Sequence, residues 1–187
     1  MWNLMHTPGG AQARSLLLAA LLIATATDLH RRRIPNLLTL LTALVAVVLH
    51  GIYGGLGDAG ASLLSLLGWF GLGFGYYRTV AGKEIGAGDI KLVMATAACI
   101  GFFPAAYVTC VSLALLILWL FLRWIVQGTA RANFTGLFRW IYVSAMPGVD
   151  KVHFRPVGMV DRTPHAPFML LSALLCYQLY QAGYLGR

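Results

Sequence analysis

Residues 92–122, LVMATAACIGFFPAAYVTCVSLALLILWLFL, decide the fold, because this stretch contains no charged side chain. It is 31 residues long, whereas one membrane-spanning helix needs about 20. The run is therefore too long for one comfortable span and short for two. Gly101 and Pro104 lie inside it, and both residue types interrupt helices. We expect two spans here, Ile90–Phe103 and Ala105–Leu122.

The rest of the chain is similarly apolar. Of its 187 residues, 59% are apolar and 11% charged, whereas an ordinary soluble domain has about 25% charged residues. This composition argues against a soluble enzyme, a disordered tail and a fibrous protein. The predicted fold class is all-α: a polytopic membrane protein with about six transmembrane helices in a single domain, residues 1–187. The other four expected spans are Ala11–Thr27, Leu37–Tyr53, Ala59–Tyr77 and Ala166–Leu185, with a cytoplasmic loop at 123–164 between spans five and six.

The basic residues predict the orientation. The chain has 14 Lys and Arg against 6 Asp and Glu. In a soluble protein this excess would suggest a nucleic-acid partner, but in a membrane protein it marks the cytoplasmic side. With the N-terminus outside, all basic residues except Arg14 and Arg187 fall inside. Joining spans four and five would move the six from Arg123 to Arg162 outside, so the charge pattern supports the split.

The three cysteines indicate no metal site. Cys99, Cys110 and Cys176 all lie in apolar stretches and none forms a CxxC pair. A zinc site needs paired thiolates or imidazoles at short spacing. We therefore interpret all three as small buried apolar residues.

Two of the six acids stand apart. Asp28 and Asp89 each lie at the inside end of an apolar span, and only spans two and three separate them. Paired carboxylates suit acid–base hydrolysis, because like-charge repulsion keeps one proton on the pair. The ionised member can deprotonate a water while the protonated member polarises a carbonyl. The simpler alternative is that acids flank spans because interfaces are polar. The remaining acids are interpreted as solvated loop residues: Asp58, Glu84, Asp150 and Asp161.

Both acids lie in distinctive local sequences. Asp89 closes Gly86-Ala87-Gly88-Asp89 and is followed by Ile90-Lys91. Glycines lack Cβ, so another backbone can approach such a loop closely. Asp28 is followed by Leu29-His30-Arg31-Arg32-Arg33-Ile34-Pro35-Asn36, in which Pro35 suits the first turn of the next helix. Lys91 either tunes the local charge or extends to the membrane surface.

At these residues the chain resembles the prepilin peptidases, membrane aspartyl proteases of the GxGD type. Gly86 to Leu92 is similar to their GxGDxKL segment, and the Asp28 segment with Ile34-Pro35-Asn36 is similar to that of their first catalytic Asp. Pro164-His165-Ala166-Pro167-Phe168 is similar to their entry to the final helix. The resemblance implies Asp28 and Asp89 as catalytic residues, without cofactor or metal. Supporting residues would be Gly86, Gly88, Lys91, Pro35 and Asn36.

The resemblance also implies a substrate and a location. The partner would be a prepilin, cleaved at the cytoplasmic face of the bacterial inner membrane ahead of its apolar helix. Membrane lipids are the other expected partner, and nucleic acid is not expected. Full-length members carry a methyltransferase region with paired cysteines, which are missing here. The chain therefore resembles the peptidase-only form of Flp/Tad pilus systems. Presenilin-like proteases share GxGD but place Tyr before the first Asp, where this chain has Thr27.

Helix direction suggests how the two acids divide the work. Asp89 at the start of span four would be the anionic base, and Asp28 near the end of span one would carry the proton. His30 and His165 at the same interface are interpreted as polar filling.

The competing class is a non-enzymatic carrier or pilus-assembly component that uses the two acids for ion or partner binding. Carriers more typically place charges near mid-membrane, whereas both acids here lie at span ends.

Overall fold

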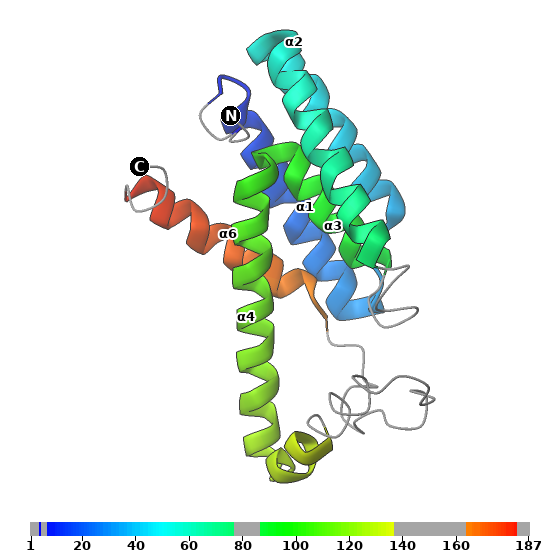
Figure 1. Cartoon of the computed structure of the whole chain (residues 1–187), viewed down its shortest axis with the longest axis vertical. Coiled ribbons are helices and arrows are strands. Elements are labelled where there is room, and N and C mark those ends of the chain that lie inside the picture. The colour runs from blue at the N-terminus through cyan, green and yellow to red at the C-terminus, as the bar shows by residue number, and fades with distance from the viewer. Residues whose placement is uncertain (1–3, 5–6, 77–86, 137–163, 183–187) are drawn as a thin grey trace. The chain divides into compact units, whose positions relative to one another are not determined.

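A computed structural model describes residues 4, 7–76, 87–136 and 164–182. Within these ranges the chain is helical and contains no strand, which confirms the all-α prediction. The helices are α1 (Gly10–Arg31), α2 (Asn36–Tyr76), α3 (Ala87–Ile100), α4 (Phe102–Val126) and α6 (Ala166–Gln181) (Figure 1).

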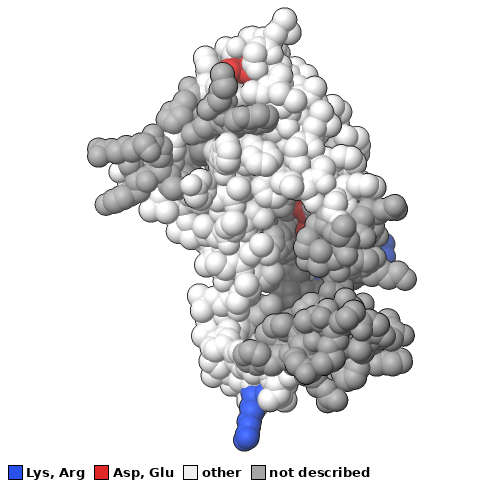
Figure 2. Space-filling view, viewed as in Figure 1, with Lys and Arg blue, Asp and Glu red and all other residues white. Residues whose placement is uncertain are grey.

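The surface is that of a membrane protein. In the described part of the chain, three helices are long and apolar enough to cross a bilayer: α1, α2 over Asn36–Gly75, and α4. Many of their large apolar side chains are exposed, including Leu56, Ile117 and Val126. Figure 2 shows few charged side chains on the face in view. The protein is therefore a helical membrane protein, while six spans and an outside N-terminus remain predictions.

Helix α2 is two helices joined by a sharp turn. Gly55 has φ 79 and ψ −175, which is not helical, so the helix is broken there. The arms on either side have roughly 20 residues each, enough for one span apiece. A Cβ on Gly51 would lie 3.4 Å from that of Ala59, so the arms fold back on each other (Figure 1). The glycine-rich turn predicted between spans two and three is thus where the chain reverses.

The long uncharged run is interrupted as predicted, but the break is at Gly101, three residues before the expected boundary at Pro104. Gly101 has φ 95, a left-handed conformation that glycine adopts without the steric cost of a Cβ. Helix α3 ends at Ile100 and α4 begins at Phe102. Pro104 does not cause the break: it lies in the first turn of α4, where its missing N–H costs no helical hydrogen bond.

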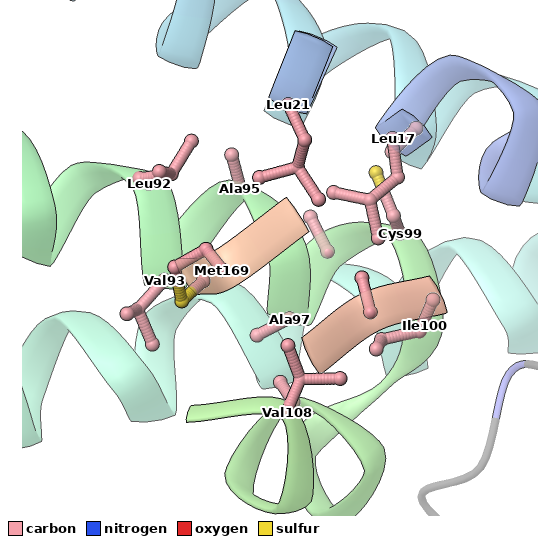
Figure 3. Close-up of a cluster of buried hydrophobic side chains, with 14 of the residues drawn as sticks. Leu17, Leu21, Leu92, Val93, Ala95, Ala97, Cys99, Ile100, Val108 and Met169 are labelled. Carbon is pink, nitrogen blue, oxygen red and sulfur yellow. The ribbon is translucent and has the colours of Figure 1, made fainter. Parts of the chain in front are cut away.

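Helix α3 forms the centre of the core. From Leu92 to Gly101 every residue except Met94 is buried. Many of these are alanine, and small side chains let helices approach closely where lipid offers no hydrophobic driving force. Figure 3 shows Leu17 and Leu21 of α1, Val108 of α4 and Met169 of α6 meeting the side chains of α3.

The carbonyls at the broken end of α3 are satisfied by side chains of α2. The last carbonyls of a helix have no partner within the helix. The Ser62 hydroxyl donates to the Ala98 carbonyl at 2.7 Å. His50 Nε2 lies 3.0 Å from the Cys99 carbonyl, and both Ser62 and His50 are fully buried. These contacts give two carbonyls a partner at a helix end that lies inside the protein.

The chain divides into two compact units, Met1–Leu113 with Pro164–Arg187, and Ala114–Thr163. The second unit contains the last part of α4 and a helical segment at 130–136. Within it, the Phe134 ring lies edge-on to Phe121, with ring centroids 5.2 Å apart, and 6.0 Å from the Trp124 ring.

Some predicted boundaries need correction. Helix α1 continues past Thr27 to Arg31, so Asp28 lies inside its last turn. Helix α4 continues to Val126, so the predicted loop 123–164 begins with helix, and its residues 137–163 lie outside the described part. Cys99 and Cys176 are buried as expected, but Cys110 is exposed, because it lies on the outward face of α4.

Candidate active site

Asp28 is a buried carboxylate one turn from the end of α1. The residue is only 7% exposed. The Arg32 backbone N–H donates to the Asp28 carbonyl at 2.9 Å, and Arg32 itself is left-handed, with φ 51. The chain therefore turns away at Arg32, one helical turn after Asp28, which is buried, whereas Arg31–Arg33 are exposed.

The first turn of α6 supplies a hydrogen bond to Asp28. The Ala166 backbone N–H donates to Asp28 Oδ2 at 3.1 Å, across 138 positions of sequence. The N-terminus of a helix carries unpaired N–H groups and the positive end of the helix dipole. Asp28 therefore receives both a donor and a favourable field from α6.

Asp89 lies in the first turn of α3, ahead of its apolar part. Burial raises the pKa of this carboxyl, and the neighbouring charge of Asp28 raises it further. The structure thus brings the two acids within electrostatic range of each other, from α1 and α3. Two neighbouring carboxyls of this kind can share one proton.

Lys91 and Asn36 pair with each other. The Lys91 ammonium donates to Asn36 Oδ1 at 2.9 Å, joining α3 to the first residue of α2. Lys91 follows Asp89 by two residues, and Asn36 follows the turn after Asp28. This hydrogen bond therefore links the two segments that carry the acids. Pro35, just before Asn36, is exposed and its carbonyl accepts the Thr39 N–H at 3.4 Å.

Glycines allow α3 to approach its neighbours. A Cβ on Gly88 would lie 3.4 Å from that of Ile34, which is ordinary contact, so Gly88 packs on the turn after α1. A Cβ on Gly73 of α2 would collide with the Ile90 side chain, so the lack of one lets α2 come close to the start of α3. Gly86 lies outside the described residues.

His165, interpreted from the sequence as polar filling, immediately precedes α6. Its Nε2 lies 3.3 Å from the hydroxyl of Ser112 on α4. Burial lowers the pKa of His165, and the nearby Asp28 acts more weakly in the opposite direction. The imidazole is therefore neutral at neutral pH and lies close to the acid pair. Ser112 is fully buried and had no sequence signal beyond being a polar residue in an apolar run.

The structure adds two contributions that the predicted division of work between the acids did not include. That prediction considered only α1 and α3, the helices that carry Asp28 and Asp89, and omitted α6. The N-terminus of α6 offsets the unfavourable end of α1 at Asp28. At Asp89, burial and the charge of Asp28 both raise the pKa of the carboxyl.

These features define a helical membrane protein with paired, partly desolvated carboxyls at one end of its bundle. Residues 15–130 match the model of the type IV leader peptidase family, and this is more than half of the chain. The chain therefore belongs to that family, which implies a peptidase with a leader-peptidase-like function. Both acids lie within the matched residues, whereas His165 and Ala166 lie beyond them. No curated protein and no solved structure matches the chain.

Proposed function

We propose that this protein is an aspartic endopeptidase that removes the basic leader from a type IV prepilin-like substrate at the cytoplasmic membrane face. The observation that carries the proposal is the pairing of Asp28 and Asp89 at one end of the bundle, where burial, and to a lesser extent the charge of Asp28, raises the pKa of Asp89. One proton shared by two carboxyls is the arrangement that peptide hydrolysis by water requires.

In this reaction the ionised carboxylate takes a proton from water as the water oxygen attacks the scissile carbonyl carbon. The protonated carboxyl gives its proton to the carbonyl oxygen, which forms a tetrahedral diol. In the second step the first carboxyl returns its proton to the amide nitrogen while the second recovers one from a diol hydroxyl. The C–N bond then breaks into an acid and an amine, and the pair is restored.

The position of the acids suits a substrate that enters from the membrane edge. Asp28 lies in the last turn of α1, directly before the exposed arginines Arg31–Arg33. A basic cluster at this position fits contact with anionic lipid headgroups. The arginines repel a basic leader, so they do not bind it, and we assign them to orientation of the enzyme in the inner membrane.

The test is cleavage of a co-expressed prepilin by Asp28→Asn and Asp89→Asn variants. Both substitutions keep the shape of the side chain and remove the acid. Asp58→Asn is the matched control. Asp58 lies just past the turn at Gly55, whereas the candidate site is near Asn36, at the other end of the first arm of α2. We expect no cleavage by either site variant and normal cleavage by the control. Cleavage by a normally expressed site variant would refute the proposal, and prepilin processing in cells that lack this chain would support a carrier instead.

A further inference from the structure

The first turn of α6 has one backbone N–H directed at the acid pair. Pro167 has no N–H, and the N–H groups of Phe168 and Met169 both donate to the His165 carbonyl, at 3.1 and 3.2 Å. The Ala166 N–H is the donor that goes to Asp28, at 3.1 Å, and Ala166 is fully buried. The direction of this bond depends on how the chain enters α6.

His165 fixes that entry. Its side chain makes no capping bond to its own helix. The ring instead lies against α4, with Nε2 3.3 Å from the Ser112 hydroxyl. Its backbone carbonyl accepts hydrogen bonds from the N–H groups of Phe168 and Met169. One residue therefore joins α4, the first turn of α6 and, through Ala166, the carboxylate of Asp28.

Asp89 has no such donor in the described part of the chain. Burial and the charge of Asp28 both favour its protonated form. The other charged or titratable groups described at this end are His165 and Lys91, of which Lys91 pairs with Asn36. The remaining ones follow Asp28 in the chain and are all exposed to solvent, which screens them: His30, Arg31, Arg32 and Arg33.

We propose that Asp28 is the ionised base of the pair, that Asp89 carries the proton, and that His165 is a positioning residue that aims the Ala166 N–H at Asp28. This inference rests on the proposed function. One oxygen of Asp28, Oδ2, is held by the amide. The other oxygen is left to accept the proton of the attacking water, while Asp89 protonates the carbonyl oxygen of the substrate.

The first experiment measures kcat and KM against pH with the full-length enzyme in liposomes and a prepilin peptide as substrate. His165→Phe keeps the bulk of the ring and removes its nitrogens, and Ser112→Ala removes the partner hydroxyl. Without the contact between His165 and Ser112, the Ala166 N–H is no longer directed at Asp28, and its hydrogen bond to this charged group weakens. We therefore expect kcat to fall about tenfold at unchanged KM. The acid limb of the pH profile moves to higher pH, because the Asp28 anion is less stabilised.

Two further variants separate positioning from folding. His165→Gln can place its side-chain amide near the position of the histidine Nε2, which contacts Ser112, and is expected to restore part of kcat. Ser172→Ala is the control on α6, because Ser172 is equally buried but bonds only to the Met169 carbonyl of its own helix. We expect its pH profile to be that of the wild type. An unchanged acid limb in His165→Phe, or one that moves to lower pH, would overturn the role of His165.

The second experiment locates the proton directly, by infrared spectroscopy of the carboxyl stretch at mildly acidic pH. We expect the protonated-carboxyl band to persist in Asp28→Asn and to disappear in Asp89→Asn. The opposite pattern would overturn the assignment of base and acid. Both experiments are distinct from the test of the proposed function: inactive Asp28 and Asp89 variants with the opposite infrared pattern would leave the peptidase intact and refute only this inference.

Discussion

Asp89 lowers the stability of the folded protein when its carboxyl is ionised. Burial and the charge of Asp28 raise its pKa, so folding favours its neutral form. A carboxyl with a raised pKa contributes stability below the pKa of the unfolded chain, and that contribution is lost as pH rises through the folded value. Above this range Asp89 is a partly desolvated charge beside another charge. The destabilising geometry is the same one that lets the pair share a proton.

We therefore predict that Asp89→Asn raises the thermal stability of the protein while abolishing cleavage. The amide is neutral at every pH, so its advantage over the wild type should be absent at acidic pH and appear as pH rises towards neutral. For a chain of this length, each 1 kcal/mol corresponds to about 2–4 °C in Tm. The measurement is Tm in detergent across this pH range, with Asp58→Asn as the control for loss of one carboxyl. Equal Tm values for the variant and the wild type at all pH values would contradict the prediction.

At the level of elements, α3 is the helix on which the site depends. It has 14 residues, about 21 Å at 1.5 Å per residue, and is shorter than the hydrocarbon core of about 30 Å. Its C-terminal end therefore lies within the protein, where its carbonyls are held by α2 through Ser62 and His50. Asp89 is at the opposite end of this anchored helix, so the capping bonds help to fix the height of the acid.

Two buried serines of α2 allow this to be tested. Ser62 donates to the Ala98 carbonyl of α3, whereas Ser65 donates to the Ala61 carbonyl of its own helix. Both side chains are fully buried. We predict that Ser62→Ala lowers the free energy of unfolding by about 1–2 kcal/mol, because it removes a donor from a buried carbonyl. Ser65→Ala should cost less. The free energy of unfolding of both variants is measured in detergent. Equal losses would mean that the hydrogen bond from Ser62 to Ala98 contributes no more stability than the one within α2.

The sequence predicted the elements better than their contacts. Apolar runs and glycines located α1, the hairpin at Gly55 and the break near Gly101, because these depend on local composition and backbone freedom. The same local signals could not show that Ser62 and His50 cap α3, because each bond joins residues far apart in the chain. The approach of Ala166 to Asp28 had a partial signal: prolines mark the start of α6, and the predicted topology places that start on the face of Asp28.

For the whole molecule, the open prediction is its orientation. Basic residues are retained on the cytoplasmic side, so a six-span chain places both termini outside. A reporter enzyme that is active only outside the cytoplasm, fused after Arg187, should be active, and one inserted after Lys83 should be inactive. Inactive reporters after both Arg187 and Lys83 would indicate an odd number of spans, in which case α3 and α4 would not form two separate crossings. An inactive one after Arg187 with an active one after Lys83 would indicate the opposite orientation.

The hydrogen bond between Ala166 and Asp28 also orders events during synthesis. Asp28 and Asp89 belong to the early helices α1 and α3, but the amide that donates to Asp28 belongs to α6, which follows them in the chain. A chain still on the ribosome, with α6 not yet inserted, has both carboxyls without the donor that distinguishes them. On the proposed mechanism, the peptidase therefore reaches its full rate only after its last described helix has docked.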